Sequence, residues 1–295
     1  MELARARFPA VRVLALGENL GFGAAYNRAI GAVECGQVAL LNNDTAVQPG
    51  WLEALQAELE RHPEAAAAGS KLLFMDRPAV VNHAGGQITA LGAAYDVGWG
   101  TADDPNDDGS RECSAATAAA MLMRREAFLE AGGFDEAYFA YFEDADLCWR
   151  FWLRGYTVRY APRARALHAY GGSTGFGRAS PFRIEHCQTN RLQNMAKNLE
   201  AGSLARLWPA SMAYDAARLW RLTRSGRPAA ARAYARGTAT FTRRLPHVLE
   251  QRKRVQAGRR RSDAELRRLG VLAGLRETAA EWRRLSRLEG ASGRA

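Results

Sequence analysis

Two short acidic segments, about 100 positions apart, carry the residue types that metal-assisted group transfer needs. The first segment, Leu40–Thr45, closes an apolar run with Asn42, Asn43 and Asp44. An Asp just past a buried strand lies at the carboxyl end of a sheet, where open α/β folds bind ligands. Carboxylate oxygens suit Mg²⁺ or Mn²⁺, and such a cation neutralises charge on a departing phosphate. Asp44 is therefore a candidate metal ligand, although Asn43 and Asp44 could instead form only a turn.

The second acidic segment, Tyr141–Leu147, contains Glu143, Asp144 and Asp146 at the expected start of a helix. A partly buried carboxylate beside another acid can be tuned to take a proton from a hydroxyl group. Glu143 and Asp146 are one helical turn apart and face a similar direction, whereas Asp144 points elsewhere, so the three need not share a role. The alternative is that these acids only complement the helix dipole.

Aromatic and imidazole side chains accompany these acids. Tyr141 and Trp149 flank the second segment and suit stacking on sugar rings. His168 follows an apolar run and is a candidate third metal ligand through a neutral ring nitrogen, or else an ordinary packing residue. His83 is expected to lie in a loop. If it belongs to the site at all, it should lie near the hydroxyl group that accepts the transferred group.

The apolar patterns predict alternating helices and strands, which is typical of an α/β fold. Residues 2–7 are expected to be helical. The first half of the chain then predicts a strand at Val11–Leu16, a helix at 24–30, a buried strand at Val38–Leu41 and a helix from Pro49 to about His62.

The middle of the chain changes character between about Gly85 and Arg111, where Gly, Asp, Asn and Pro accumulate and predict a mobile surface loop. After it, Arg124–Ala131 is expected to be helical, and a helix and a strand are expected to lead to His168. Beyond Pro181 the pattern is helical and rich in Arg.

Charge divides the chain into two parts. Residues 1–200 contain 19 Lys and Arg and 24 Asp and Glu, whereas residues 201–295 contain 22 and 7. The basic part is expected to seek an anionic surface. The four cysteines are widely spaced and fit neither a zinc site nor a disulfide framework, and no run is long enough to span a bilayer. We therefore expect a cytoplasmic chain.

Five segments in order resemble the family 2 inverting glycosyltransferases of the GT-A fold, most closely the bacterial rhamnosyltransferase-like branch. The resemblance covers about residues 8–195. The segments are Asn19–Gly23, Leu40–Thr45, Gly132–Glu136, Tyr141–Leu147 and His168.

The resemblance implies a nucleotide-diphosphate sugar donor, with UDP or dTDP as the nucleotide, and a Mg²⁺ or Mn²⁺ ion at Asp44. It implies that Asp144 is the catalytic base and that His168 lies near the metal. Independently of the resemblance, we expect Glu143 and Asp146, with Tyr141 and Trp149, to contact the acceptor or the sugar. The segments implied to contact the nucleotide sugar contain Asn19, Gly21, Asn27, Asn42 and Asn43.

The resemblance also implies an incomplete GT-A core at residues 1–200, because the family pattern opens with two further strands. A chain without those strands is expected to have unpaired backbone edges, to fold poorly and to bind donor weakly. Residues 201–295 are expected to form a basic helical extension that associates with the inner face of the plasma membrane, near a glycan or lipid-linked acceptor.

Other interpretations of the same residues remain open. The chain could be a catalytically inactive scaffold of the same family. A nucleic-acid-binding protein would have to use Arg252–Arg254 and Arg259–Arg261, but the acidic first part supplies no recognition element, so no nucleic-acid partner is expected. The basic part could also be an ordinary solvated helical hairpin.

Overall fold

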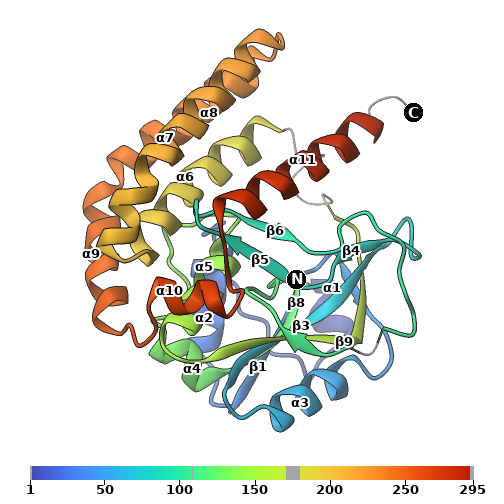
Figure 1. Ribbon diagram of the computed structural model, residues 1–295. Helices are drawn as coiled ribbons and strands as arrows, with labels where there is room; N and C mark the ends of the chain where they lie inside the picture. Colours follow the sequence, from blue (N-terminus) through green and yellow to red (C-terminus); the bar gives the residue numbers. More distant parts are fainter. Residues whose placement is uncertain (1, 108, 171–179, 293–295) are drawn as a thin grey trace.

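The computed structural model describes residues 2–107, 109–170 and 180–292, which form a mixed α/β fold around two sheets (Figure 1). The larger sheet has the order β1-β8-β3-β9-β2, with β4 beside β3 and β7 beside β9. Its strands are β1 (Gln37–Leu41), β2 (Thr45–Val47), β3 (Ala65–Phe74), β4 (Val81–His83), β7 (Arg111–Glu112), β8 (Ala120–Arg124) and β9 (Thr157–His168). The smaller sheet contains β5 (Gly86–Thr89), β6 (Ala94–Asp96) and β10 (Leu272–Ala273).

The centre of the larger sheet is β3, which is buried along its whole length between antiparallel β8 and parallel β9. Four alanines followed by Gly69 keep this strand thin enough for close packing on both faces. A Cβ on Gly69 would lie 2.6 Å from the Cβ of Ala116, so the close approach of Ala116 favours glycine there. Residues of β8 alternate between the two cores, with Met121 on one side and Leu122 on the other.

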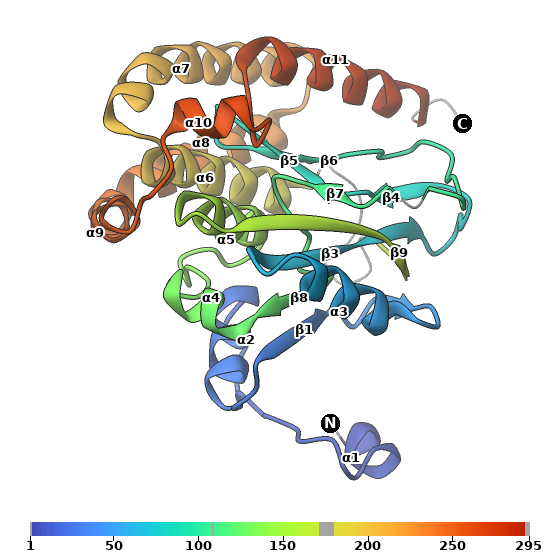
Figure 2. The same cartoon turned by 60° about the horizontal axis from the view of Figure 1, so that its bottom comes forward.

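Helices cover the larger sheet on both faces. On one face, α3 (Trp51–Arg61) buries Leu55 and Leu59, which are one helical turn apart, and the Trp51 indole donates to Ser70 Oγ at 2.7 Å. Figure 2 shows α3 on one side of this sheet and the smaller sheet on the other. The remaining helices of the first 200 residues are α1 (Glu2–Arg7), α2 (Phe22–Gly31), α4 (Arg125–Glu130), α5 (Glu143–Leu153) and α6 (Pro181–Asn198).

The basic part of the chain packs onto this core. Val255, Leu266 and Leu272 belong to the same buried cluster as the residues of α5, and β10 pairs in parallel with β5. Among the described residues, no helix has the length and apolar character needed to cross a bilayer. The helices beyond residue 200 are α7 (Ala201–Arg224), α8 (Pro228–Arg243), α9 (Leu245–Ala257), α10 (Asp263–Arg268) and α11 (Leu275–Ser292).

The strand predicted at Val11–Leu16 is wrong. These residues have no regular structure, and Val11 and Leu14 are 57% and 45% exposed. An alternating apolar sequence forms a strand only where a neighbour satisfies its backbone groups, and no described strand pairs with this segment. The segment instead links α1, which lies apart from the packed body in Figure 2, to the start of α2.

The surface loop predicted between Gly85 and Arg111 is wrong for its first half, to Asp96, whereas residues 97–107 and 109–110 form turns and irregular chain, as expected of a loop; Asp108 lies outside the described residues. The segment forms β5 and β6 and buries Ile88 and Leu91 in the main core. Its glycines serve tight connections between short strands, such as the turn at Gly92, whose φ is 81°. Turn residues mark hairpins as well as loops, so composition did not distinguish the two.

The buried strand predicted at Val38–Leu41 exists as β1, but it lies at the edge of the sheet. It pairs only with β8 among the described strands, and only Leu40 is fully buried. The predicted helices at residues 2–7, 24–30, 49–62 and 124–131 are confirmed as α1 to α4, with small shifts at their ends.

Candidate functional site

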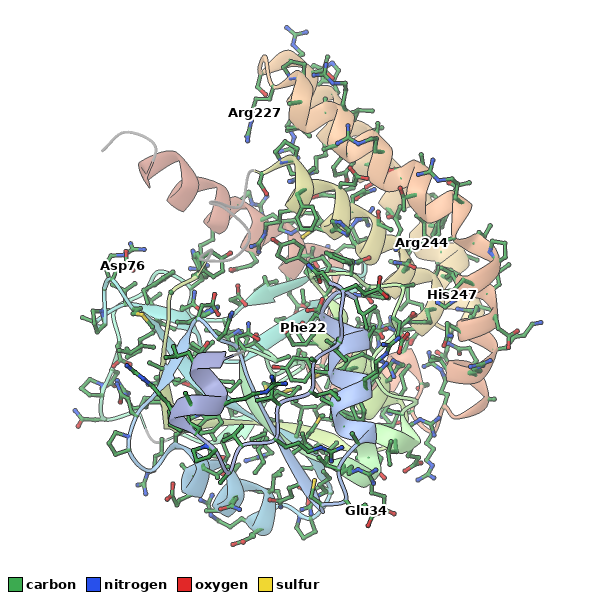
Figure 3. The ribbon with its side chains drawn as sticks, turned by 180° about the vertical axis from the view of Figure 1, so that it is seen from behind. Phe22, Glu34, Asp76, Arg227, Arg244 and His247 are labelled. Atoms are coloured by element: carbon green, nitrogen blue, oxygen red, sulfur yellow. The ribbon has the colours of Figure 1, made fainter. Side chains whose placement is uncertain are left out.

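A cavity of about 310 Å³ lies where β1, β4 and β9 end and α5 begins. Asp44 and Asp144 both line it, so the two acidic segments meet at one site. Figure 3 labels Phe22, which reaches this cavity from the first turn of α2. The polar and aromatic residues of the lining include Phe22, Asn42, Asp44, His83, Asp96, Tyr141, Glu143, Asp144, His168, Tyr170 and Arg183.

Asp44 and His168 form a close pair because β2 and β9 are antiparallel neighbours with Thr45 opposite His168. His168 Nε2 lies 3.5 Å from Asp44 Oδ1, which is buried and receives no hydrogen bond. His168 Nδ1 lies 3.0 Å from Asn82 Oδ1. With the Asn82 amide in this orientation, Nδ1 carries the proton and Nε2 directs its lone pair toward Asp44.

This pair fits a divalent cation. Burial lowers the pKa of His168, which outweighs the opposing effect of the Asp44 charge and favours the neutral ring that binds metals. When the ring is neutral with its proton on Nδ1, His168 Nε2 and Asp44 Oδ1 are two acceptor atoms 3.5 Å apart that can turn to one cation, and a carboxylate with an imidazole suits Mn²⁺ or Mg²⁺. No set of three His, Cys, Asp or Glu side chains in the described ranges is arranged to hold a metal, so protein would supply only part of the coordination shell.

The start of α5 is positioned by an unusual turn. Tyr141 and Phe142 have φ angles of 71° and 66°, a backbone conformation that residues other than glycine rarely adopt. The Asn190 amide holds this turn by donating to the carbonyls of Ala140 and Tyr141 at 2.9 and 2.7 Å. Strain of this kind persists where surrounding contacts fix it, and here it places Asp144 at the cavity.

Two backbone amides hold the Asp144 carboxylate. Ala118 N donates to Oδ2 at 3.1 Å and Ala145 N donates to Oδ1 at 2.8 Å. Burial raises the pKa of Asp144 despite these hydrogen bonds, which makes it a stronger base than an exposed Asp. Burial and then the neighbouring Asp144 charge raise the pKa of Glu143 to about 8, and Glu143 Oε2 has no hydrogen-bond partner.

A histidine and carboxylate pair that the sequence did not predict also lines the cavity. His83 Nδ1 lies 3.0 Å from Asp96 Oδ1, and His83 Nε2 is buried without a hydrogen-bond partner. His83 is only 4% exposed and lies at the end of β4, not in a loop. The two residues come from strands in different sheets, and no local motif links them.

The residues expected to contact the nucleotide separate into three groups. Asn42 lines the cavity, whereas Asn43 is exposed and does not. Asn19 accepts from Gly21 N at 3.0 Å, and Gly21 turns the chain tightly against Phe139, where a Cβ would lie 2.8 Å from that ring. Asn19 and Gly21 therefore shape the entry to α2 and do not line the cavity themselves.

Asn27 has a structural position away from the cavity, which corrects its predicted nucleotide contact. Its amide donates to Phe134 O and accepts from Phe134 N, each at 2.9 Å. These bonds hold the turn at Gly133, whose φ of 69° places it in the left-handed region. An Asn near a glycine-rich turn can brace the backbone as well as bind a ligand, and the sequence does not separate these roles.

Asp146 and Trp149 do not contact the cavity, so their predicted roles at the acceptor or sugar are wrong. Trp149 is fully buried in the main core. Asp146 is also fully buried, and it pairs with Arg150 at 2.8 Å and with Lys197 at 3.0 Å. α5 is buried on nearly all sides, so the spacing of its residues could not show which face meets the cavity.

A larger cavity of about 460 Å³ lies on the other side of α5, beside α9. Its buried cation Lys197 is already paired with Asp135 at 2.7 Å, and the charges of Lys197 and His247 keep the pKa of Asp135 well below its ordinary value in spite of burial. Its acidic and basic groups satisfy each other, so the smaller cavity is the better candidate site.

Comparison with known proteins identifies the family of the chain. Residues 37–258, more than half of the chain, match the profile of "Glycosyl transferase family group 2". The N-acetylglucosaminyl-diphospho-decaprenol L-rhamnosyltransferase of Mycobacterium tuberculosis (strain CDC 1551 / Oshkosh) is 34% identical over 206 residues, which is 62% of this chain and 66% of that protein. The O-antigen biosynthesis protein RfbC of Myxococcus xanthus is 33% identical over 135 residues, 43% of this chain and 10% of that protein.

The fold is shared with a solved glycosyltransferase. GalNAc-T7, solved with UDP, GalNAc and Mn²⁺, superimposes with a TM-score of 0.54 over 72% of this chain and 41% of that chain, at 14% identity. This likeness confirms the predicted α/β GT-A architecture. Since the family profile spans most of the sheet and the whole α5 segment, the chain belongs to glycosyl transferase family group 2.

Proposed function

We propose that the chain transfers a sugar from a UDP- or dTDP-linked donor to a hydroxyl group of a glycan or lipid-linked acceptor, with inversion at the sugar carbon. The observation that carries this proposal is that Asp144 shares one cavity with the pair formed by Asp44 and His168. A basic carboxylate and a cation site in one cavity are what such a transfer requires.

In this proposal Asp144 takes the proton of the acceptor hydroxyl. The acceptor oxygen forms a bond to the sugar carbon, the bond from that carbon to the donor phosphate breaks, and the electron pair leaves with the diphosphate. Asp44 and His168 would hold a Mg²⁺ or Mn²⁺ ion, whose charge stabilises the leaving diphosphate when it is bound. The amides of Ala118 and Ala145 keep the base in place.

The relatives favour a rhamnose-like sugar and a diphosphate-bearing lipid acceptor. The Mycobacterium tuberculosis protein is named for transfer of L-rhamnose to an N-acetylglucosaminyl-diphospho-lipid, and the Myxococcus xanthus protein is named for O-antigen biosynthesis. We extend this substrate class, and a role in cell-surface polysaccharide synthesis, to this chain as part of the proposal.

The test is a transfer assay with dTDP- and UDP-linked sugars, Mn²⁺ or Mg²⁺, and an N-acetylglucosaminyl-diphospho-lipid. We expect transfer by the wild-type chain, its loss with a metal chelator, and a fall of about 100-fold or more in kcat/KM for Asp44→Asn. Asp76→Asn is the matched control, because Asp76 is an exposed carboxylate at the edge of the molecule (Figure 3). Donor binding without any transfer by the wild-type chain would instead favour the inactive scaffold.

We further propose that the chain binds peripherally to anionic membranes through α7. Trp220 and Leu219 are exposed on this helix, and Arg224 lies 5.1 Å from the centre of the Trp220 ring. Figure 3 shows Arg227 at the tip of the hairpin that α7 forms with α8. Exposed aromatic and basic side chains together suit the boundary between lipid headgroups and acyl chains.

Flotation with anionic vesicles tests membrane binding. Binding should fall as salt rises from about 0.05 M to 0.5 M, because screening weakens attraction to the headgroups. Trp220→Ala should reduce the bound fraction at every salt concentration. Equal flotation with neutral and anionic vesicles, or no effect of salt, would contradict the proposal and favour a solvated hairpin.

A further inference from the structure

Arg183 places a positive charge in the cavity. It lies in the first turn of α6, where Ser180 Oγ accepts a hydrogen bond from Arg183 N at 3.2 Å and so caps the helix. Its side chain lines the same cavity as Asp44, Asp144 and His168. No feature of the sequence distinguishes it, because the chain contains 41 Lys and Arg residues.

The Arg183 guanidinium is held by aromatic rings. Its Cζ lies 4.8 Å from the centre of the Tyr141 ring and 5.5 Å from that of Tyr170. Tyr141 belongs to the strained turn that leads into α5, so Arg183 and Asp144 are positioned by the same few residues. Contact with two rings orients the planar guanidinium and offsets part of the cost of removing it from water.

Among the described residues, Arg183 lacks the carboxylate partner that many other buried Lys and Arg side chains have. Within residues 2–107, 109–170 and 180–292, no carboxylate lies within ion-pair distance of its guanidinium, and no backbone carbonyl accepts a hydrogen bond from it. The cations that do have a carboxylate within 4 Å include Lys71, Arg150, Arg159, Arg191, Lys197 and Arg259.

A half-buried guanidinium without a carboxylate is a natural partner for an anion. Removing Arg from water is costly unless a negative group replaces the lost hydration, and its planar fork matches the oxygens of a phosphate. Of the carboxylates that line the cavity, Asp144 accepts two backbone amides and Asp96 pairs with His83. In the described part of the chain, Asp44 and Glu143 each keep an oxygen without a hydrogen bond, but neither lies within ion-pair distance of Arg183. The cavity therefore offers Arg183 to a ligand that brings its own negative charge.

We propose that Arg183 binds the diphosphate group of a substrate and works together with the cation site at Asp44 and His168. This inference rests on the proposed function. The diphosphate has two possible sources, the nucleotide of the donor and the diphosphate of a lipid-linked acceptor. Arg183 would contact whichever diphosphate enters the cavity.

Calorimetry with UDP, dTDP and UMP in the presence of Mn²⁺ tests the donor source. If the donor supplies the diphosphate, Arg183→Gln should weaken binding of UDP and dTDP by about 10- to 100-fold and that of UMP by less. Arg183→Lys should recover part of the loss, since it keeps the charge but not the fork. Arg77→Gln is the matched control, because Arg77 also stacks on an aromatic ring, 4.6 Å from the centre of Phe74, but lies outside the cavity.

Steady-state kinetics test the acceptor source. If Arg183→Gln binds UDP and dTDP normally but raises the KM for a diphosphate-linked acceptor about 10-fold, the acceptor supplies the diphosphate and the inference stands. Normal nucleotide affinity together with a normal acceptor KM would overturn it while leaving the proposed function intact. A wild-type chain that binds neither nucleotide and transfers no sugar would overturn the proposed function itself. Thermal unfolding of each variant checks that it is folded. If Arg183→Gln is unfolded, the binding and kinetic measurements are made on Arg183→Lys instead.

Discussion

Asp144→Asn is expected to lower the transfer rate by about 10²- to 10⁴-fold, the range that a general base contributes. The amide has nearly the shape of the carboxylate but cannot take a proton from the acceptor hydroxyl. The amide oxygen of the Asn can accept from only one of the two backbone amides of Ala118 and Ala145. The free energy of unfolding should therefore fall by only about 1 kcal/mol. Transfer assays and thermal unfolding on the same preparation measure both effects.

The pH dependence of the wild-type rate gives an independent check. Asp144 must be ionised to act as the base, and burial raises its pKa, so the rate should increase with pH until this group has lost its proton. Glu143→Gln serves as the comparison, because Glu143 lines the same cavity but has no amide donors on Oε2. If Glu143→Gln abolished transfer while Asp144→Asn retained it, the base would be Glu143.

Asp146→Asn is expected to affect mainly stability and not the transfer rate. The free energy of unfolding should fall by about 3–5 kcal/mol. Asp146 is fully buried, and its carboxylate neutralises both Arg150 and Lys197. The amide would leave Arg150 in the interior without a carboxylate, whereas Lys197 would keep Asp135. For a chain of this size the midpoint of thermal unfolding should fall by about 10 °C.

Asp144 and Asp146 lie two positions apart on one helix, so together they test whether the cavity is correctly identified. Molecules of Asp146→Asn that remain folded should still bind the donor, because Asp146 does not line the cavity. A variant at Asp146 with wild-type stability and no transfer would show that its carboxylate reaches the substrate after all.

The short motifs correctly predicted that Asp44 and Asp144 lie at one cavity, while their roles stay predictions. The position of Asp44 after an apolar strand and that of Asp144 at a helix start are local properties, and the structure brings both to one cavity. The orientation of α5, in contrast, is set by contacts with segments far away in the sequence. The roles of Asp146 and Trp149 were misjudged because a helix buried on nearly all sides has no polar face to read.

The parts of the site that depend on distant contacts could not be predicted. His83 and Asp96 come from strands in two sheets, and Arg183 comes from a helix that follows β9. The segment that carries Asp96 was expected to be a loop because its turn residues are also loop residues. The predicted strand at Val11–Leu16 failed for a related reason, since pairing partners are absent from a local pattern.

The attachment of the basic helices to the sheet decides how the proposed membrane binding can be tested. β10 pairs with β5, and the Ser114 hydroxyl donates to Val271 O at 2.7 Å. The ring of Trp282 in α11 stacks on that of Tyr214 in α7, with 4.2 Å between the ring centres. β5 in turn pairs with β6, which carries Asp96 to the cavity. Deleting residues 201–295 would thus remove β10 from the smaller sheet and disturb the cavity as well as the proposed membrane surface, so single surface substitutions are the cleaner way to test the two proposals separately.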